Sequence, residues 1–357
     1  MSEKLLEIKN LHVMYKTDED DVYALNGINL ELDRGETLGL VGETGAGKTT
    51  IALSILKLLP ERTGFITQGE ILFEGQDVVN MKEEKMRMLR GNDISMIFAD
   101  PMSALNPLHT VGSQIAEVIL LHNTGMSHAD VEKKVDEMME LVGIPAERKV
   151  EYPHQFSGGM RQRIVIAMAL SCTPRLLLAD EPTTALDVTI EAQILRLMKR
   201  LRDEQGTSII LITHNMGVVA EVCDYVYVMY AGMVMEQAEV FDLFENTSHP
   251  YTQGLLKSIP KLDSREERLY TIEGVVPNLL RLPEGCNFCN RCGKAEARCL
   301  KEKPGLYGIG ADGNGMSHKV RCFLYEGRGM EDAGAVESGG PDAQAASSDG
   351  EVAEDGR

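Results

Sequence analysis

Gly42-Glu43-Thr44-Gly45-Ala46-Gly47-Lys48-Thr49 is the stretch of sequence that decides how this chain folds. The glycines let successive backbone N–H groups face a phosphate, Lys48 adds a fixed positive charge, and the Thr49 hydroxyl can ligate Mg²⁺. The apolar run Glu36–Val41 predicts a buried strand before this phosphate-binding loop, and Thr50–Leu59 predicts a helix after it. Together they indicate an α/β fold that holds a nucleotide at the loop.

A second phosphate-binding turn is expected much later in the chain. Phe156-Ser157-Gly158-Gly159-Met160-Arg161-Gln162-Arg163 opens a helix with two glycines, and the N-terminus of a helix attracts anions. One nucleotide site rarely needs two such turns. We therefore expect two similar subunits to meet head to tail, each contributing its serine-glycine turn (157–159) to the nucleotide of the other.

Two carboxylates and a histidine follow apolar runs that predict buried strands. Leu176-Leu177-Leu178-Ala179-Asp180-Glu181-Pro182 ends with an acidic pair, and Ile209-Ile210-Leu211-Ile212-Thr213-His214 ends in a histidine. Ligands of open α/β sheets bind at the carboxyl ends of the strands, so we expect these side chains beside the phosphates, Mg²⁺ and a water. The predicted strands are Ile94–Ala99, Leu176–Ala179, Ser208–Thr213 and Tyr225–Met229.

With these motifs in this order, the chain resembles the nucleotide-binding subunits of ABC transporters from Leu5 to about Pro260. Ala185-Leu186-Asp187 resembles the D-loop of that family, and Tyr15 matches the aromatic residue that stacks on adenine. The resemblance implies an α/β P-loop NTPase fold of the ABC type, an ATPase activity, and ATP with Mg²⁺ as cofactors. It implies nucleotide contacts at Tyr15, Gly42, Glu43, Thr44, Gly45, Ala46, Gly47, Lys48, Thr49, Thr50, Ser157, Gly158, Gly159 and Asp187.

Charge and position indicate a role for each catalytic residue, because phosphoryl transfer to water needs positive charge on the phosphates and an oriented water. Lys48 supplies charge together with Mg²⁺, which Thr49 and Asp180 are expected to ligate. Glu181 polarises the attacking water, and His214 contacts the γ-phosphate. The serine-glycine turn of the other subunit completes the site in this interpretation.

One position departs from the family pattern. Met96-Ile97-Phe98-Ala99-Asp100-Pro101-Met102-Ser103-Ala104-Leu105-Asn106-Pro107 resembles the Q-loop of peptide importers, but Ala99 stands where a glutamine is expected. A methyl group neither ligates Mg²⁺ nor holds a water. Either hydrolysis is slow here, or solvent replaces the amide, or the active site of consequence lies on a partner subunit. His214-Asn215, in place of His-Asp, is a milder departure.

The segment 1–260 is therefore expected to form the ABC nucleotide-binding domain, with a helical subdomain at about 100–170. Within the subdomain, Ser127 can cap a helix and Gly143 can end it. The apolar residues that recur between them at helical spacing are Val131, Val135, Met138 and Val142. Another long helix is predicted over Asp187–Gly206. The resemblance implies that the helical subdomain meets the partner ATP and the membrane subunits.

The residues at the end of the predicted nucleotide-binding domain, and those after it, indicate which class of solute the transporter carries. Ser248-His249-Pro250-Tyr251-Thr252-Gln253-Gly254-Leu255-Leu256, followed by Ile259-Pro260, resembles the C-terminal extension of ATPases that serve oligopeptide, dipeptide and nickel importers. The extension is expected to continue over 261–326 as a small cysteine-rich C-terminal domain. It holds five of the seven cysteines.

Three interpretations of these cysteines are open. Disulfides are disfavoured in a reducing cytosol, whereas four thiolates suit a structural Zn²⁺ ion. The family resemblance implies a [4Fe-4S] cluster with the ligands Cys286, Cys292, Cys299 and Cys322. Cys289 is an alternate ligand, because Cys286–Cys292 also resembles part of a ferredoxin run. Cys172 and Cys223 are isolated among apolar neighbours and are expected to be buried small hydrophobes.

The composition narrows the class of protein. With 357 residues, of which 43% are hydrophobic, the chain can fill the cores of two or three folding units. The net charge of -19 argues against nucleic acid as the main partner, because binding phosphates needs basic surface. No apolar run approaches the roughly eighteen residues of a spanning helix, and Met1–Lys4 lacks a signal-peptide core. Residues 327–357, with eight acidic and two basic side chains, are expected to be a disordered tail.

We predict a peripheral ATPase on the cytoplasmic face of the cell membrane, which powers an ABC importer of oligopeptides or dipeptides. The expected partners are a second ABC ATPase subunit in a heterodimer, two transmembrane permease subunits and an extracytoplasmic substrate-binding protein. The alternatives are a nickel importer, a soluble ABC-type ATPase of translation or DNA repair, and the nucleotide-binding half of an asymmetric pair marked by Ala99. The soluble class usually carries two motor cassettes or a long coiled-coil insertion, whereas this chain has one motor without heptads.

Overall fold

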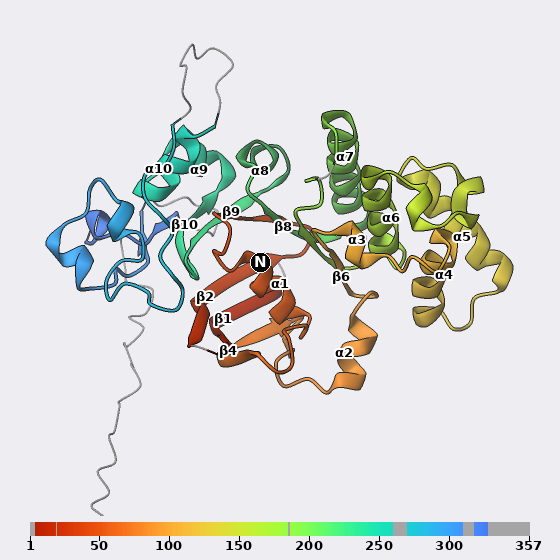
Figure 1. Ribbon diagram of the computed structural model, residues 1–357, viewed down its shortest axis with the longest axis horizontal. Helices are drawn as coiled ribbons and strands as arrows, with labels where there is room; N and C mark the ends of the chain where they lie inside the picture. The colour runs from red at the N-terminus through yellow and green to blue at the C-terminus, as the bar shows by residue number, and fades with distance from the viewer. Residues whose placement is uncertain (1–3, 19, 185, 260–269, 310–317, 328–357) are drawn as a thin grey trace, which may run out of the picture.

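The structure, a computed structural model, describes residues 4–18, 20–184, 186–259, 270–309 and 318–327. Two sheets form the frame of these residues (Figure 1). The smaller sheet has the order β2-β1-β4-β5 and consists of β1 (Lys4–Lys16), β2 (Asp21–Asp33), β4 (Gly64–Phe73) and β5 (Gln76–Asp77). The larger sheet has the order β11-β12-β10-β9-β3-β8-β7-β6 and consists of β3 (Thr37–Val41), β6 (Ile94–Ile97), β7 (Leu176–Asp180), β8 (Ser208–Thr213), β9 (Tyr225–Tyr230), β10 (Met233–Glu239), β11 (Tyr307–Gly308) and β12 (Lys319–Val320).

The centre of the larger sheet is parallel, since β3 pairs with β8 and β9, and β7 pairs with β6 and β8. Its central strands are buried on both faces, as their continuous apolar runs predict. The predicted strands are confirmed, with small shifts at their ends. The largest shift is in β6, which ends at Ile97, because Phe98 and Ala99 lie exposed in the loop that follows.

Alternate residues of the parallel strands enter two different cores. Ile210 and Ile212 of β8 face the core that contains α1 (Lys48–Ile55) and the smaller sheet, so α1 lies between the two sheets. Ile209 and Leu211 face the core on the opposite side, which is formed with the other helices. The phosphate-binding loop joins β3 to α1, and it therefore lies at the edge where the parallel strands end.

The remaining helices lie around the larger sheet or beyond its β6 edge (Figure 1). They are α2 (Glu83–Leu89), α3 (Pro101–Ala104), α4 (Val111–His122), α5 (His128–Leu141), α6 (Gly158–Leu170), α7 (Val188–Gln205), α8 (Met216–Val222), α9 (Val240–Glu245) and α10 (Pro250–Lys257). The helices α3 to α6 gather near the β6 edge, within the segment predicted to be the helical subdomain. The domain limits themselves stay a prediction.

Two predicted helix starts are confirmed. Ser127 caps α5 and Asp187 caps α7, each by accepting a hydrogen bond from the backbone N–H three residues on. Gly143 and Gly206 follow these helices with a positive φ of 70°. That conformation is the one in which a helix commonly ends, and glycine adopts it without strain.

Two details of the helix predictions were wrong. In α5, Met139 enters the core and Met138 is only half-buried. Residues four positions apart lie on one face of a helix, so Met139 continues the face formed by Val131 and Val135. The helix predicted over 50–59 begins at the end of the phosphate-binding loop and stops at Ile55. It stops there because Lys57 takes a positive φ of 50°, which breaks the helical backbone.

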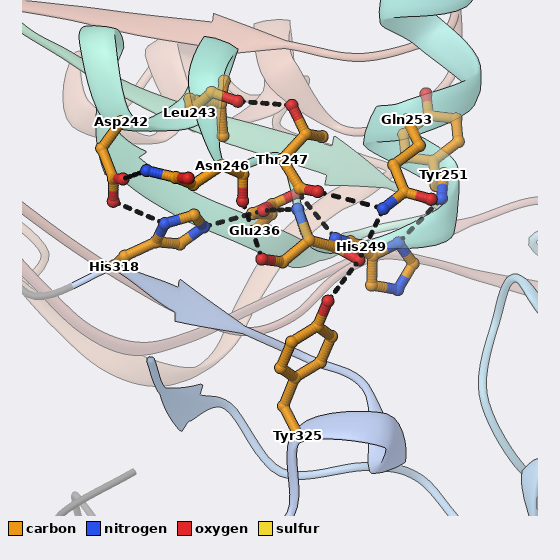
Figure 2. A network of polar contacts seen from close by, with 11 residues as sticks. Glu236, Asp242, Leu243, Asn246, Thr247, His249, Tyr251, Gln253, His318 and Tyr325 are labelled. Atoms are coloured by element: carbon orange, nitrogen blue, oxygen red, sulfur yellow. Dashed lines mark hydrogen bonds and ion pairs between the residues drawn. The ribbon is translucent and has the colours of Figure 1, made fainter. Parts of the chain in front are cut away.

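The C-terminal extension is joined to the preceding domain by strand pairing and by a buried polar network. β12 pairs with β10 and carries β11 on its other side, so the extension widens the larger sheet. Figure 2 shows His318 between two acidic side chains: Nε2 lies 2.8 Å from Oε1 of Glu236, and Nδ1 lies 2.6 Å from Oδ2 of Asp242. The Glu236 carboxylate also accepts hydrogen bonds from the backbone N–H groups of Ser248 and His249.

The cysteine-rich part of the extension contains turns and short 3₁₀ helices, at Cys289–Arg291 and Ala297–Leu300. The predicted tail over 327–357 lies outside the described residues apart from Gly327, as do 261–269 and 310–317 of the predicted C-terminal domain. In the described part of the chain, no helix combines the length and the apolar composition needed to cross a membrane.

Candidate functional site

The phosphate-binding loop requires glycine at two positions. Gly42 and Gly47 have positive φ values of 154° and 98°, which other residues rarely adopt. A Cβ atom at Gly42 would lie 2.1 Å from the carbonyl oxygen of Met229, and one at Gly47 would lie 2.7 Å from a side-chain carbon of Leu25. The loop is therefore packed against β9 and β2, and this packing fixes the path of its backbone.

Lys48 is buried at the start of α1, with its ammonium group against the loop. Nζ donates hydrogen bonds to the carbonyl oxygens of Gly42, at 2.7 Å, and of Glu43, at 3.1 Å. Burial lowers the pKa of Lys48, although the nearby carboxylates of Glu181 and Asp180 act in the opposite direction. A phosphate is a stronger acceptor for this charge than a carbonyl oxygen and can take the place of both.

Thr49 and Asp180 meet where α1 begins and β7 ends. The Thr49 hydroxyl donates to Oδ2 of Asp180 at 2.8 Å. Burial raises the pKa of Asp180, and this hydrogen bond and the charge of Lys48 partly oppose the rise. Oxygen ligands of this kind are the ones that Mg²⁺ prefers, and a bound cation would favour the ionised carboxylate. The donor chemistry of the pair therefore fits the predicted magnesium site.

Glu181 and His214 lie side by side after β7 and β8. Oε1 of Glu181 is 3.1 Å from Nδ1 of His214, and Oε2 accepts a hydrogen bond from the Thr184 hydroxyl at 3.0 Å. Burial acts to raise the pKa of Glu181, but the hydrogen bonds from His214 and Thr184 and the charge of Lys48 outweigh it, so the pKa is lowered. Glu181 is thus held as a carboxylate, the form that can accept a proton from water.

Ala99 lies at the same edge of the sheet as these residues. β6 pairs with β7 through Ile97 and Ala179, so the loop that contains Ala99 leaves the sheet beside the strand end that carries Asp180. The Ala99 side chain is exposed. Its methyl group presents no polar atom to a metal ion or a water in this region.

The other residues predicted to contact the nucleotide from this half of the site lie in or near the phosphate-binding loop. Thr44 and Gly45 form its exposed tip, and Ala46 is buried. Tyr15 lies near the end of β1, with its hydroxyl 3.4 Å from Oγ1 of Thr50 in α1. Tyr15 is therefore a neighbour of the helix that follows the loop, which is compatible with an adenine contact.

Three residues singled out in the sequence are helix N-caps. Ser157, Asp187 and Asn215 accept backbone hydrogen bonds at the starts of α6, α7 and α8. Asn and Asp cap equally well, so the replacement at Asn215 is neutral for the backbone. Ser157 and Gly158 are exposed, and α6 lies away from α1 in Figure 1. Within one chain, the serine-glycine turn and the phosphate-binding loop are therefore separate.

Three contacts at the site were missed by reasoning from the sequence. Thr184 holds the Glu181 carboxylate, Tyr251 accepts a hydrogen bond from the backbone N–H of Glu43, and Arg291 pairs with the Glu43 carboxylate. Tyr251 and Arg291 are visible in the sequence only as members of the extension motifs. No local pattern marks contacts across 208 and 248 positions of the chain.

The cysteines of the extension gather around one small pocket of about 20 Å³, lined by Cys286, Cys289, Cys292, Cys299 and Cys322. All of them are free thiols. Burial raises the pKa of Cys286 to about 11 and also raises the pKa values of Cys289, Cys292 and Cys322. Within the described residues, no three His, Cys, Asp or Glu side chains are arranged to hold a metal ion. The structure thus brings the predicted thiols together without assembling them into a metal site.

The two isolated cysteines differ from each other. Cys223 is buried, as predicted, whereas Cys172 is only half-buried and its Sγ lies 3.8 Å from the carbonyl oxygen of Val118. Burial raises the pKa of both thiols. Neither is therefore a reactive thiolate.

Two protein-family profiles match the chain. The ABC transporter family matches residues 25–184, which contain the phosphate-binding loop, the serine-glycine turn and the acidic pair. The family described as Oligopeptide/dipeptide transporter, C-terminal region, matches residues 235–299. The second match covers most of β10, all of α9 and α10, and most of the cysteine motif.

Curated relatives are about half identical to this chain over most of its length. The dipeptide transport ATP-binding protein DppD of Bacillus subtilis is 49% identical over 328 residues, which cover 91% of this chain and 96% of that protein. The oligopeptide transport ATP-binding protein OppD of the same organism is 50% identical over 324 residues, which cover 90% and 89%.

Solved structures of ATP-binding cassettes are also similar to this chain. A dimeric structure of the ATP-binding cassette MJ0796, in a post-hydrolysis state with ADP and Pi, has a TM-score of 0.61 and 28% sequence identity over 66% of this chain and 98% of that one. The structure of cbiO1 from Clostridium perfringens has a TM-score of 0.57 and 28% identity over 68% and 91%. By sequence, fold and site geometry, this chain belongs to the ABC transporter family, as an ATP-binding subunit with the oligopeptide/dipeptide transporter C-terminal region.

Proposed function

We propose that this chain hydrolyses ATP to drive the uptake of oligopeptides or dipeptides through membrane permease subunits. One observation carries the proposal: an ATP site and the C-terminal region of oligopeptide/dipeptide transporters lie on one chain. Relatives that align with both parts are named as peptide transport proteins. No feature of the described site favours nickel transport, translation or DNA repair over peptide uptake.

In the proposed reaction, Lys48 exchanges the loop carbonyls for the β,γ-phosphates of ATP, where its charge stabilises the transition state. Thr49 and Asp180 would hold Mg²⁺, which would supply further positive charge to the phosphate oxygens. Glu181 accepts the proton of the attacking water. His214 orients the Glu181 carboxylate through their hydrogen bond and reaches the γ-phosphate.

A second ATPase subunit is proposed to complete each site. The serine-glycine turn is exposed at the start of α6 and lies apart from the phosphate-binding loop of its own chain, so it is available to an ATP bound by a partner. The solved MJ0796 cassette, which is similar to this chain, is dimeric. We propose a heterodimer, because Ala99 deprives this chain of an amide that a different partner subunit can supply at its own site.

The groove between α4 and α5 is proposed as the docking surface for a permease segment. The groove has a volume of about 740 Å³. Along it, Leu120, Leu121 and Val150 are 38%, 61% and 67% exposed, and exposed apolar residues with a polar rim are typical of protein-binding surfaces. A permease docked there would hold the chain on the cytoplasmic face of the cell membrane, while an extracytoplasmic substrate-binding protein delivers the peptide.

The cysteine pocket is proposed as a metal centre, with a [4Fe-4S] cluster preferred and Zn²⁺ as the alternative. Support comes from the common pocket of the five thiols and from the spacing of the predicted ligands Cys286, Cys292, Cys299 and Cys322. Metal binding would deprotonate the thiols and cross-link the turns and short 3₁₀ helices that carry them. The proposed role of the centre is to stabilise the extension.

The transport proposal is tested with the assembled complex in lipid nanodiscs, containing this chain, a second ATPase subunit, two permease subunits and the substrate-binding protein. Peptide-loaded binding protein is expected to stimulate ATP hydrolysis, and peptide-free binding protein is expected to have little effect. Stimulation by a nickel chelate instead of peptide would favour the nickel importer. Copurification with ribosomes or DNA, without permeases, would contradict a transport role.

A further inference from the structure

Arg291 belongs to the cysteine-rich extension, yet its guanidinium group contacts the phosphate-binding loop. Nη1 lies 2.6 Å from Oε2 of Glu43, and Nη2 lies 3.1 Å from Oε1. The Arg291 side chain is only 6% exposed, and that of Glu43 is 25% exposed. The two residues thus form a bidentate charge pair shielded from water, the geometry in which an arginine and a carboxylate interact strongly.

The extension fixes this guanidinium group through contacts that do not involve Glu43. Nε and Nη2 donate to the backbone carbonyl oxygens of Glu273 and Ile272, at 3.1 Å each. Nη1 also donates to the Tyr230 hydroxyl at 3.1 Å. Because all three nitrogens have partners outside the loop, Arg291 presents a fixed positive charge rather than a mobile one.

Every polar group of Glu43 has a partner as well. Its carboxylate pairs with Arg291, its backbone N–H donates to the Tyr251 hydroxyl at 2.9 Å, and its carbonyl oxygen accepts from Nζ of Lys48 at 3.1 Å. A continuous set of contacts therefore runs from Arg291 through Glu43 to the catalytic lysine.

Aromatic packing supports these polar contacts. The ring centroids of Tyr230 and Tyr251 are 4.7 Å apart, and Phe288 lies 5.3 Å from each of them. The three rings come from β9, α10 and the extension. The Arg291 guanidinium lies 5.7 Å from the Tyr230 centroid and 6.0 Å from that of Phe288. This cluster holds the extension, the domain and the loop in one arrangement.

A carboxylate in the phosphate-binding loop creates an electrostatic problem, because it repels the triphosphate of ATP. We propose that Arg291 is a positioning residue for the ATP site, which cancels the Glu43 charge and holds that side chain toward the extension. The proposal rests on the ATP site that membership of the family establishes, and it goes beyond the proposed transport role. The cysteine-rich extension would in this way contribute to nucleotide affinity on its own chain.

The test uses the full-length chain and a fluorescent ATP analogue titrated in the presence of Mg²⁺. Arg291→Gln leaves the Glu43 carboxylate uncompensated and is expected to weaken nucleotide affinity by about tenfold. Adding Glu43→Gln to Arg291→Gln removes the repelling charge and is expected to recover most of that loss. Arg298→Gln is the matched control, since Arg298 is an ion-paired arginine of the same extension whose partners are Glu302 and Glu326. It is expected to bind nucleotide like the wild type.

A role limited to anchoring the extension predicts a different pattern. In that case the double variant binds no better than Arg291→Gln, and Arg298→Gln loses affinity too; either result overturns the proposal, as does unchanged affinity in Arg291→Gln. Thermal unfolding of each variant verifies the fold. If Arg291→Gln does not fold, Arg291→Met replaces it in both comparisons, because methionine keeps much of the apolar stem of the side chain and removes the positive charge. The readout is nucleotide binding alone, so failure of the transport proposal leaves the result interpretable.

Discussion

Thr49 donates a hydrogen bond to Asp180 at 2.8 Å, although 131 positions separate the two residues in the chain. Thr49 follows Lys48 at the start of α1, and Asp180 ends β7. The parallel pairing of β3 with β8, and of β8 with β7, brings the two ends to one edge of the sheet. Lys48, Thr49 and Asp180 therefore lie together at this edge, where we propose that the phosphates and Mg²⁺ bind.

Lys48 and Glu181 are expected to act on different steps. Lys48→Ala should abolish ATP binding or weaken it severely, because it removes the ammonium group that we propose pairs with the phosphates. Glu181→Gln should preserve binding and stabilise an ATP-bound dimer, while lowering kcat by about 10²–10³-fold, since it cannot take the proton of the attacking water. Nucleotide titration, phosphate release and gel filtration with ATP measure the three effects.

Lys57→Ala is the control for these variants. It removes a lysine just after α1, whose Nζ donates to the carbonyl oxygens of Val79 and Met81 and not to the loop. Its nucleotide affinity should match the wild type. Unchanged hydrolysis in the Glu181→Gln protein would remove Glu181 from the proposed mechanism.

The proposed head-to-tail dimer makes a prediction about Ser157. Ser157→Arg should harm hydrolysis at the partner's site more than at its own, because the serine-glycine turn and the phosphate-binding loop of one chain are separate. A mixed dimer with one tagged variant subunit and one subunit inactivated at its own Glu181 or its equivalent distinguishes the two sites. Equal loss at both sites, with wild-type stability, would argue against the arrangement.

Ala99→Gln should raise the ATPase rate of the assembled transporter. The amide would add a contact to the metal and the attacking water, and a single preorganised contact is worth roughly 2.7–4 kcal/mol at most. We expect a smaller gain, about tenfold or less, because solvent can already occupy the gap. If the rate does not change, while inactivation of the partner's catalytic carboxylate abolishes turnover, the working site belongs to the partner.

The cysteine pocket predicts a specific metal content. Protein purified without oxygen should be brown and contain iron and acid-labile sulfide, and Cys286→Ser or Cys322→Ser should lose the metal while retaining ATP binding. Cys172→Ser, which alters a cysteine outside the pocket, should retain it. Stoichiometric zinc without sulfide would instead support the alternative metal.

His318 predicts a pH dependence of stability. Burial acts to lower its pKa, but the hydrogen bonds and charges of Glu236 and Asp242 outweigh burial, so the pKa is raised. A raised pKa in the folded state contributes stability that is fully present below the unfolded value of about 6.5 and is lost as the pH rises through the folded value. His318→Gln should therefore lower the free energy of unfolding by about 2–4 kcal/mol at low pH, and by less at high pH. Urea unfolding of the wild type and of His318→Gln, from below pH 6.5 to above the raised pKa, measures the difference in their free energies of unfolding. If this difference does not change with pH, the titration of His318 is contradicted.

The sequence by itself determined the local elements of the site. The loop at 42–49, the caps at Ser127 and Asp187 and the apolar runs of the parallel strands depend on residues within a few positions of one another or on a simple period. Such local patterns predict the same helix, strand or loop whatever the rest of the chain packs against them. The order of strand, loop, helix and acidic strand end was therefore sufficient to predict the α/β fold, whereas the nucleotide contacts stay a prediction.

Only the tertiary structure decided which distant side chains meet. Arg291 and Glu43 are 248 positions apart, and His318 reaches Glu236 through the pairing of β12 with β10. These contacts depend on strand order, register and side-chain rotamer, and many arrangements satisfy the same hydrophobic pattern. The partial burial of Cys172 was missed for the same reason. Burial is a property of the packed surface around a residue, which the identities of its neighbours in the chain do not specify.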